Sequence, residues 1–264
     1  MDENNLQRSH YNKLAKAYEY HYSDELTKKY RHEIFLKKLF KDQDLNFKKI
    51  LDIGCGTGEI STYLYEIYPD AEIFGAYISD ENIKIYNGKF KKNRGGVEGA
   101  RIGYRLNLIE DIVYKKKFDY IIASGFLHHV YKDLEKVFIN ISKMLDNNGK
   151  FIFIEPNSDY ILEPLRKIWY RLDNKLFDHV NESALSYKNL LAINQKLRTG
   201  FQESKVFYFG GPGFFLINNS MVFRLNKKIK TLLFVPLLNL DKLFSFLPKY
   251  FLAGFGALWE KNKL

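Results

Sequence analysis

The sequence has little cysteine and proline and no long uninterrupted apolar segment: one Cys and six Pro occur among 264 residues. The single Cys55 excludes an internal disulfide framework and a zinc site built from several cysteines. The longest uncharged run lies between Lys205 and Arg224, but Gly, Pro and Asn interrupt it, whereas a spanning helix needs about 20 mostly apolar residues. The first residues lack the basic flank and apolar stretch of a signal peptide. We therefore expect a cytoplasmic protein.

Basic residues exceed acidic ones, with 41 Lys and Arg against 31 Asp and Glu and a net charge of +10 at pH 7. Only nine of the basic residues are arginine, and Asn, Ile, Tyr and Phe are also abundant. A composition drifting toward AT-rich codons produces this excess without an anionic partner, and the alternative is a functional basic surface. Charge alone therefore does not indicate a nucleic-acid partner.

Apolar strands alternate with amphipathic helices through residues 50–155. In the clearest helix, Leu134, Val137, Phe138 and Ile141 follow the i, i+3, i+4, i+7 pattern of one face. A strand, a helix and a strand at this spacing form a parallel crossover, and repeated alternation predicts a doubly wound sheet. The expected strands are residues 49–53, 72–76, 102–106, 118–123 and 150–154, the expected helices are 9–40, 60–68 and 134–145, and residues 89–99 and 146–149 are expected as a loop and a turn.

The last third of the chain has a different pattern. Residues 160–200 are expected as helices and residues 204–209 as a strand. Residues 214–250 are rich in Phe and Leu and contain Pro236 and Pro248, and the glycine-containing tail at 253–259 suits a final edge strand. No composition break is sharp enough to define a second domain.

The most specific motif is LDIGCGTGE at residues 51–59, between an expected strand and an expected helix. Its glycines let the backbone turn sharply and approach a ligand, and ligands of doubly wound sheets bind at the carboxyl ends of the strands. A dinucleotide site needs G-x-G-x-x-G. Here the third residue after Gly56 is Glu59, whose charge would oppose a diphosphate, and a Gly-Lys-Ser/Thr phosphate loop is absent.

The pattern G-x-G-x-G preceded by an acid resembles the first motif of class I S-adenosylmethionine-dependent methyltransferases. The resemblance extends over most of the first 160 residues. Residues 12–18 are similar to the N-terminal lid helix, 118–122 to the fourth strand, 126–130 to the loop that follows it in quinone-type and small-molecule members, and 144–149 with 151–157 to the post-motif segment.

The resemblance implies an α/β fold with a doubly wound, mainly parallel seven-stranded sheet, helices on both faces and a helical insertion before the last strand. It also implies a single methyltransferase domain over residues 1–264. In that domain, residues 1–45 would form the N-terminal lid helices, residues 46–157 the cofactor-binding core, and residues 158–264 the acceptor-side helices, last strands and insertion.

The cofactor implied by the resemblance is S-adenosyl-L-methionine, which carries no phosphate and has a zwitterionic amino-acid end. Backbone groups of the loop and Asp52, directly or through water, are suited to hold that end. The expected cofactor contacts are Asp52, Gly54, Cys55, Gly56, Gly58, Tyr77, Ile78, Asn107, Leu108 and Ser124, with Tyr11 and Tyr18 closing from the lid helix. The alternative for Tyr11 and Tyr18 is a plain core position on an amphipathic helix. No metal ligand is expected.

Two expected contacts depart from the family pattern. Tyr77 stands where members usually have the acid of Gly-x-Asp-x-Ser, which bonds both ribose hydroxyls. A phenol cannot chelate a diol as a carboxylate does, although Asp80 or Glu81 could reach in from the next turn. Tyr77 therefore implies lower cofactor affinity, a modified cofactor or a lost activity. Asn107 matches the usual adenine-binding Asp, and its amide oxygen can still accept from the adenine amino group.

Two adjacent histidines, His128 and His129, follow the strand whose end faces the transferred methyl group in the resembling family. An imidazole titrates near neutral pH, so either histidine is a candidate general base. The alternative is a histidine that contacts the cofactor or caps the following helix. We place His129 on the cofactor side and His128 on the substrate side. Glu155 and Asn157 are expected as acceptor contacts or, alternatively, as helix caps.

The elaborated segment at residues 201–264 carries nine Lys or Arg against three Asp or Glu. Three lysines within residues 227–230, followed by mostly apolar residues at 231–235, combine charge and apolar surface as interfacial helices do. Residues 214–250 are therefore expected to form an extra helical layer, a contact with a membrane surface, or a pocket for a lipid-like acceptor.

The resemblance implies a methyltransferase, and we expect it to act on oxygen or carbon of a small-molecule, glycan or lipid-like acceptor. One alternative is a catalytically silent or repurposed member, which Tyr77 motivates. A second is a nucleic-acid methyltransferase, but residues 124–127 lack the Asn/Asp-Pro-Pro-aromatic motif of base-amino methylators. The oligomeric state is left open.

Overall fold

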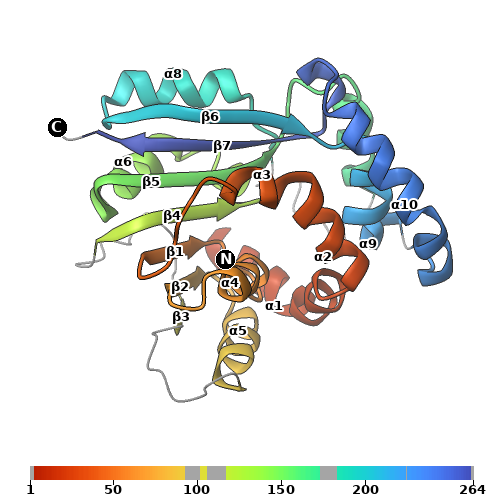
Figure 1. Cartoon of the computed structure of the whole chain (residues 1–264), viewed down its shortest axis with the longest axis horizontal. Helices are drawn as coiled ribbons and strands as arrows, with labels where there is room; N and C mark the ends of the chain where they lie inside the picture. Colours follow the sequence, from red (N-terminus) through yellow and green to blue (C-terminus); the bar gives the residue numbers. More distant parts are fainter. Residues whose placement is uncertain (1–2, 93–101, 106–116, 173–182, 224, 263–264) are drawn as a thin grey trace.

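The computed structural model describes residues 3–92, 102–105, 117–172, 183–223 and 225–262. Seven strands form one sheet in the order β3-β2-β1-β4-β5-β7-β6 (Figure 1). The five strands β1 to β5 are parallel, and β7 pairs antiparallel with both β5 and β6. The strands are β1 Lys49–Ile53, β2 Glu72–Tyr77, β3 Ile102–Arg105, β4 Phe118–Ser124, β5 Leu145–Pro156, β6 Phe201–Phe209 and β7 Gly254–Lys261. The mainly parallel seven-stranded sheet is confirmed.

Helices pack on both faces of the sheet. The α-helices are α1 Glu3–Tyr22, α2 Glu25–Arg31, α3 Lys37–Phe40, α4 Glu59–Ile67, α5 Asp80–Lys92, α6 Leu134–Met144, α7 Glu163–Leu172, α8 Tyr187–Leu197, α9 Ser220–Phe223 and α10 Lys227–Phe244. Short 3-10 turns are η3 Leu127–His129 and η5 Lys249–Phe251, and π-helical turns are η1 His32–Leu36 and η4 Phe214–Asn218. Helices α6 and α8 cover one face, and α2, α3, α4 and α10 contribute to the core on the other.

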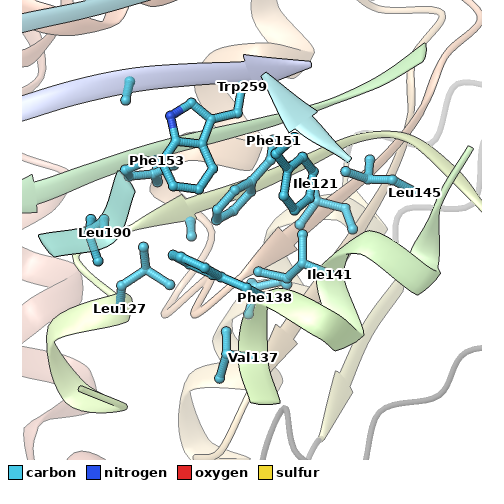
Figure 2. Packing of buried hydrophobic residues seen from close by; sticks show 14 of the residues in the cluster. Ile121, Leu127, Val137, Phe138, Ile141, Leu145, Phe151, Phe153, Leu190 and Trp259 are labelled. Carbon is cyan, nitrogen blue, oxygen red and sulfur yellow. The ribbon is translucent and has the colours of Figure 1, made fainter. Parts of the chain in front are cut away.

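The core on the α6 side is built from aromatic rings. Phe138 of α6 packs edge-on against Trp259 of β7 at 5.3 Å between ring centroids, and Phe153 of β5 lies 4.9 Å from the same indole (Figure 2). These three side chains are fully buried. The apolar residues that repeat at helical spacing within 134–145 are therefore buried in the core, as the sequence predicts.

The expectation of an edge strand at residues 253–259 is wrong. Strand β7 lies inside the sheet between β5 and β6, and β6 is the edge strand. The physical reason is burial, because the first six residues of β7 are all buried and its backbone pairs on both sides. An apolar strand containing two glycines suits such an interior position.

Two smaller boundary predictions are also corrected. Residues 89–92 belong to α5 instead of a loop, because Phe90 is buried against Tyr86 at helical spacing, with ring centroids 4.7 Å apart. The expected turn at 146–149 lies within β5 as a bulge, since Phe118 pairs with Leu145 and Tyr120 with Lys150. Residues 146–149 therefore have no pairing partner in β4, and the strand continues to Pro156.

The segment between β6 and β7 contains η4, α9, α10 and η5, so the expected helical insertion before the last strand is present. Asp241 of α10 ties this insertion to the loop after β6. Its buried carboxylate accepts hydrogen bonds from the backbone N–H groups of Gly211, Gly213 and Phe214 and from the Tyr30 hydroxyl. In the part of the chain that the structure describes, no helix is long and apolar enough to cross a membrane.

Candidate functional site

A cavity of about 340 Å³ opens at the carboxyl ends of β1, β2, β4 and β5. The structure gathers most of the predicted site residues in its wall. The predicted residues that line it are Tyr11, Tyr18, Asp52, Gly54, Cys55, Gly56, Tyr77, Ile78, Ser124, His128 and His129. Gly58 does not line it, and Asn107 and Leu108 lie outside the described residues. A parallel sheet places its strand ends at one edge, which is why residues distant in sequence meet here.

The glycine loop turns through the left-handed region at three positions, Gly54, Gly56 and Gly58, with φ of +72°, +52° and +89°. A Cβ on Gly56 would meet no atom within 4 Å, so the backbone there faces open space. Gly58 has a packing role, because a Cβ there would lie 2.7 Å from the Tyr86 ring. Gly58 caps α4 and lets it pack against α5, while Gly56 leaves room for a ligand.

Asp52 is the second-to-last residue of β1, just before the glycine loop, and is almost fully buried. Its Oδ2 accepts a hydrogen bond of 2.6 Å from the Ser61 hydroxyl, and Ser61 in turn accepts from Tyr86 at 3.1 Å. Burial raises the pKa of Asp52 to about 7, while the Ser61 hydrogen bond acts in the opposite direction. A cationic ligand group in the cavity would stabilise the carboxylate, since an opposite charge favours the ionised form.

Helix α1 covers the cavity through Tyr11. Its hydroxyl lies 3.3 Å from His129 Nδ1, and its ring packs edge-on against Tyr77 with centroids 5.7 Å apart. Tyr11 is buried, as expected for a core position, and it also lines the cavity. Asp80 of α5 pairs with Arg8 of α1, and neither Asp80 nor Glu81 lines the cavity.

The histidine loop after β4 is fixed by Glu155 at the end of β5. Glu155 Oε1 accepts from the backbone N–H groups of Phe126 at 2.9 Å and Leu127 at 2.6 Å. Its Oε2 lies 2.7 Å from His128 Nδ1. Of the two roles expected for Glu155, these contacts show the capping one, and Glu155 also lines the cavity. It also holds the His128 ring, which the sequence did not predict.

Burial sets the protonation of this pair. It lowers the pKa of His128 to about 3, so the imidazole is neutral at physiological pH. It raises the pKa of Glu155 to about 8, opposed by the three backbone N–H groups that face the carboxylate. When Glu155 is ionised it accepts the His128 Nδ1–H, and the lone pair then resides on Nε2. This arrangement can remove a proton.

Two ion pairs also line the cavity, and of their four members only Glu59 was singled out from the sequence. Arg31 of α2 pairs with Glu59 of α4, and Glu163 pairs with Arg166 within α7. All four side chains line the cavity together with Lys167. Asn157, an expected acceptor contact, instead donates to the backbone oxygens of Lys249 and Leu252. Within the described ranges, no group of three or more His, Cys, Asp or Glu could hold a metal ion.

Comparison with known proteins gives three related findings. The family profile described as a methyltransferase domain matches residues 46–211, which is more than half of the chain. The chain is 36% identical over 126 residues to an uncharacterized methyltransferase of Schizosaccharomyces pombe, which covers 42% of this chain and 43% of that protein. It is 29% identical over 170 residues to a ubiquinone biosynthesis O-methyltransferase of Pelagibacter ubique, which covers 58% and 68%.

The fold resembles that of magnesium protoporphyrin IX methyltransferase from Synechocystis PCC 6803, solved with bound SAH. The TM-score is 0.65 at 13% sequence identity, and the match covers 98% of this chain and 100% of that one. An identity this low shows the fold. The chain spans less than half the length of the S. pombe relative and about two thirds of the P. ubique relative.

Proposed function

The chain belongs to the class I S-adenosylmethionine-dependent methyltransferases, and we propose that it transfers a methyl group from S-adenosylmethionine to an oxygen or carbon of a small or lipid-like acceptor. One observation carries this proposal: the open turn at Gly56 and the His128–Glu155 pair share one cavity. The P. ubique and Synechocystis proteins, by their names, methylate small molecules, which supports an acceptor of that class. We further propose that residues 1–264 act as one domain.

The residues present fit the cofactor. The unfilled space above Gly56 admits a ligand close to the backbone, and buried Asp52 offers a carboxylate to an ammonium group. Tyr77 and Ile78 would lie beside the ribose, and Tyr11 with Tyr18 would cover the ligand from α1. We assign these residues, with Gly54, Cys55 and Ser124, to the cofactor side. Gly58 supports the loop from beneath.

When bound, S-adenosylmethionine would supply a methyl group on a sulfonium sulfur, whose carbon an acceptor atom can attack in line with the departing sulfur. His128 would take the proton of an acceptor hydroxyl or acidic carbon on Nε2. Glu155 would hold the His128 ring through Nδ1 and stabilise the imidazolium that forms. His129, in contact with Tyr11 of α1, would lie on the cofactor side and help that helix exclude water.

Titration calorimetry with S-adenosylhomocysteine, the demethylated product, tests the proposal. We expect saturable binding of one ligand per chain, because donor and product share the groups that the glycine loop would hold. A chain that binds neither S-adenosylmethionine nor its product would contradict the proposal and favour a catalytically silent or repurposed member. Mass spectrometry of the small molecule retained by the purified protein would then identify the alternative ligand.

Replacing Tyr77 with aspartate is expected to tighten product binding about fivefold. A carboxylate at the end of β2 accepts from both ribose hydroxyls, and hydrogen bonds to a charged group contribute roughly 1 kcal/mol more than neutral ones. Calorimetry on Tyr77→Asp measures the change. Tyr77→Phe is the control, because it keeps the ring against Tyr11 and removes only the hydroxyl. Weaker binding by Tyr77→Asp would show that the tyrosine ring itself is required.

A further inference from the structure

Exposed apolar side chains are concentrated in two segments. Of the 18 large hydrophobic side chains exposed in the described part of the chain, 13 lie within residues 161–168 and 229–251. We call these 13 the apolar face. Its members are Ile161, Leu162, Leu165 and Ile168 around α7, Ile229, Leu232, Val235, Leu240 and Leu243 on α10, and Phe246, Leu247, Tyr250 and Phe251 after it. A monomeric soluble protein rarely leaves a patch of this kind uncovered.

Helix α7 is oriented opposite to an ordinary surface helix. Its charged residues Glu163 and Arg166 are buried and line the cavity, while Leu165 and Ile168 point to solvent. A surface helix of a globular protein normally buries its apolar stripe and exposes its charges. Helix α7 therefore turns charged side chains toward the cavity and apolar side chains toward solvent.

Helix α10 has apolar residues on two opposite sides. Phe234 and Leu238 are buried against the core, next to Asp241. Leu232 and Leu243 lie on the other side at helical spacing, and Leu232 is 76% exposed. Only the inner side has a partner among the described residues, and Figure 1 places the helix at the outer edge of the molecule.

The two segments of the apolar face are joined. The Ile161 backbone N–H donates to the Tyr250 carbonyl at 2.8 Å, and Lys249 pairs with Asp159 at 2.7 Å. These contacts hold the start of α7 against η5, directly after α10. The apolar face therefore extends from α10 to the helix that lines the cavity.

The exposed charged side chains of the apolar face are lysines, and acids beside it are ion-paired: Glu33 with Lys242, and half-buried Asp159 with Lys249. Within residues 159–168 and 225–251, the exposed charged side chains are Lys167, Lys227, Lys228 and Lys242. The acids Glu163 and Asp241 are buried. Lysines around an apolar helix surface match the interface of a bilayer that contains anionic lipids. A second copy of the same face would bring like charges together.

We propose that the apolar face docks on a membrane surface that contains anionic lipids. Leu232, Leu243 and Phe246 insert at the boundary between headgroups and acyl chains, and the lysines contact the headgroups. Helix α7 then lies between the bilayer and the cavity, and a lipid-like acceptor enters the site beside it. This last step rests on the proposed methyl transfer, whereas docking does not.

Vesicle flotation with the full chain tests the proposal. We expect binding to vesicles of phosphatidylcholine mixed with phosphatidylglycerol, weaker binding to phosphatidylcholine alone, and weakening by salt. Leu232→Glu combined with Leu243→Glu should reduce binding at least about tenfold. The matched control is Phe47→Glu, which also alters an exposed apolar side chain (83% exposed) but lies outside the apolar face.

Calorimetry with S-adenosylhomocysteine on the same variants separates the two proposals, because the apolar face should leave product affinity unchanged. Lost docking with normal product binding in the double variant supports the membrane proposal. Equal vesicle binding by the double variant and Phe47→Glu overturns it, as does absence of binding to anionic vesicles. A dimer that forms without lipid and is abolished in the double variant overturns it in favour of a second copy.

Discussion

Replacing Glu155 with glutamine is expected to reduce the rate of methyl transfer by about 10²- to 10⁴-fold, the usual contribution of a positioned general base. Glutamine has nearly the same shape, so its amide oxygen can still accept from the backbone N–H groups of Phe126 and Leu127. Its amino group then faces His128 Nδ1 and donates to it. The imidazole proton moves to Nε2, and the lone pair that would accept the substrate proton is lost.

The same pair predicts how the wild-type rate depends on pH. Below about pH 8, protonated Glu155 donates to His128 Nδ1, and Nε2 carries the ring proton. As pH rises through about 8, Glu155 ionises, Nδ1–H donates to it, and Nε2 becomes the acceptor. The rate should therefore rise with pH and level off above about 8, and this rise should be absent in Glu155→Gln.

Two controls separate this catalytic effect from loss of structure. Glu163→Gln is the matched substitution, because it also removes a carboxyl from the cavity wall. Glu163 pairs with Arg166, so this change leaves His128 and its partner intact. Thermal unfolding tests stability. Because burial raises the pKa of Glu155 above its ordinary value of 4.5, ionisation opposes folding as pH rises from 4.5 to about 8. Glutamine cannot ionise, so it should not lower stability at pH 8. A Glu155→Gln variant with a normal rate would exclude the assigned role.

The sequence predicts the central half of the sheet well because its signals there are local. The run at 49–53 is a short apolar strand, the glycines after it occupy positive φ, and Leu134 to Ile141 repeat on one helix face. Each feature depends on neighbours within a few residues. Parallel pairing then brings His128 and Asp52 to one edge of the sheet without further information.

Features set by distant contacts were missed. Glu155 and His128 are 27 residues apart, and their contact requires β4 and β5 to be adjacent. The place of β7 depends on which two strands bury it. In α7, helical spacing identifies an apolar side, which in most helices faces the core. Here the charged residues Glu163 and Arg166 face inward instead. Which side of a helix faces inward depends on the elements that pack against it, and the local sequence pattern does not contain that information.

Replacing Gly56 with valine is expected to weaken binding of S-adenosylhomocysteine about 100-fold. A side chain at this position enters the open space that the ligand would occupy, and overpacking of this kind costs roughly 1–3 kcal/mol. Valine at a φ of +52° is also strained, by roughly 1–3 kcal/mol. Since small domains are stable by about 5–15 kcal/mol, the fold should persist with a lower melting temperature.

The strain and the steric block must be separated for the result to test the site. Gly200→Val is the matched control, because Gly200 also has positive φ, at +82°, and lies outside the cavity lining. Both variants should lose thermal stability, but only Gly56→Val should lose product binding in calorimetry. If Gly56→Val remains folded and binds as tightly as the wild type, the ligand does not approach the glycine loop. The roles of Asp52 and His128 would then have to be sought with a ligand bound elsewhere in the cavity.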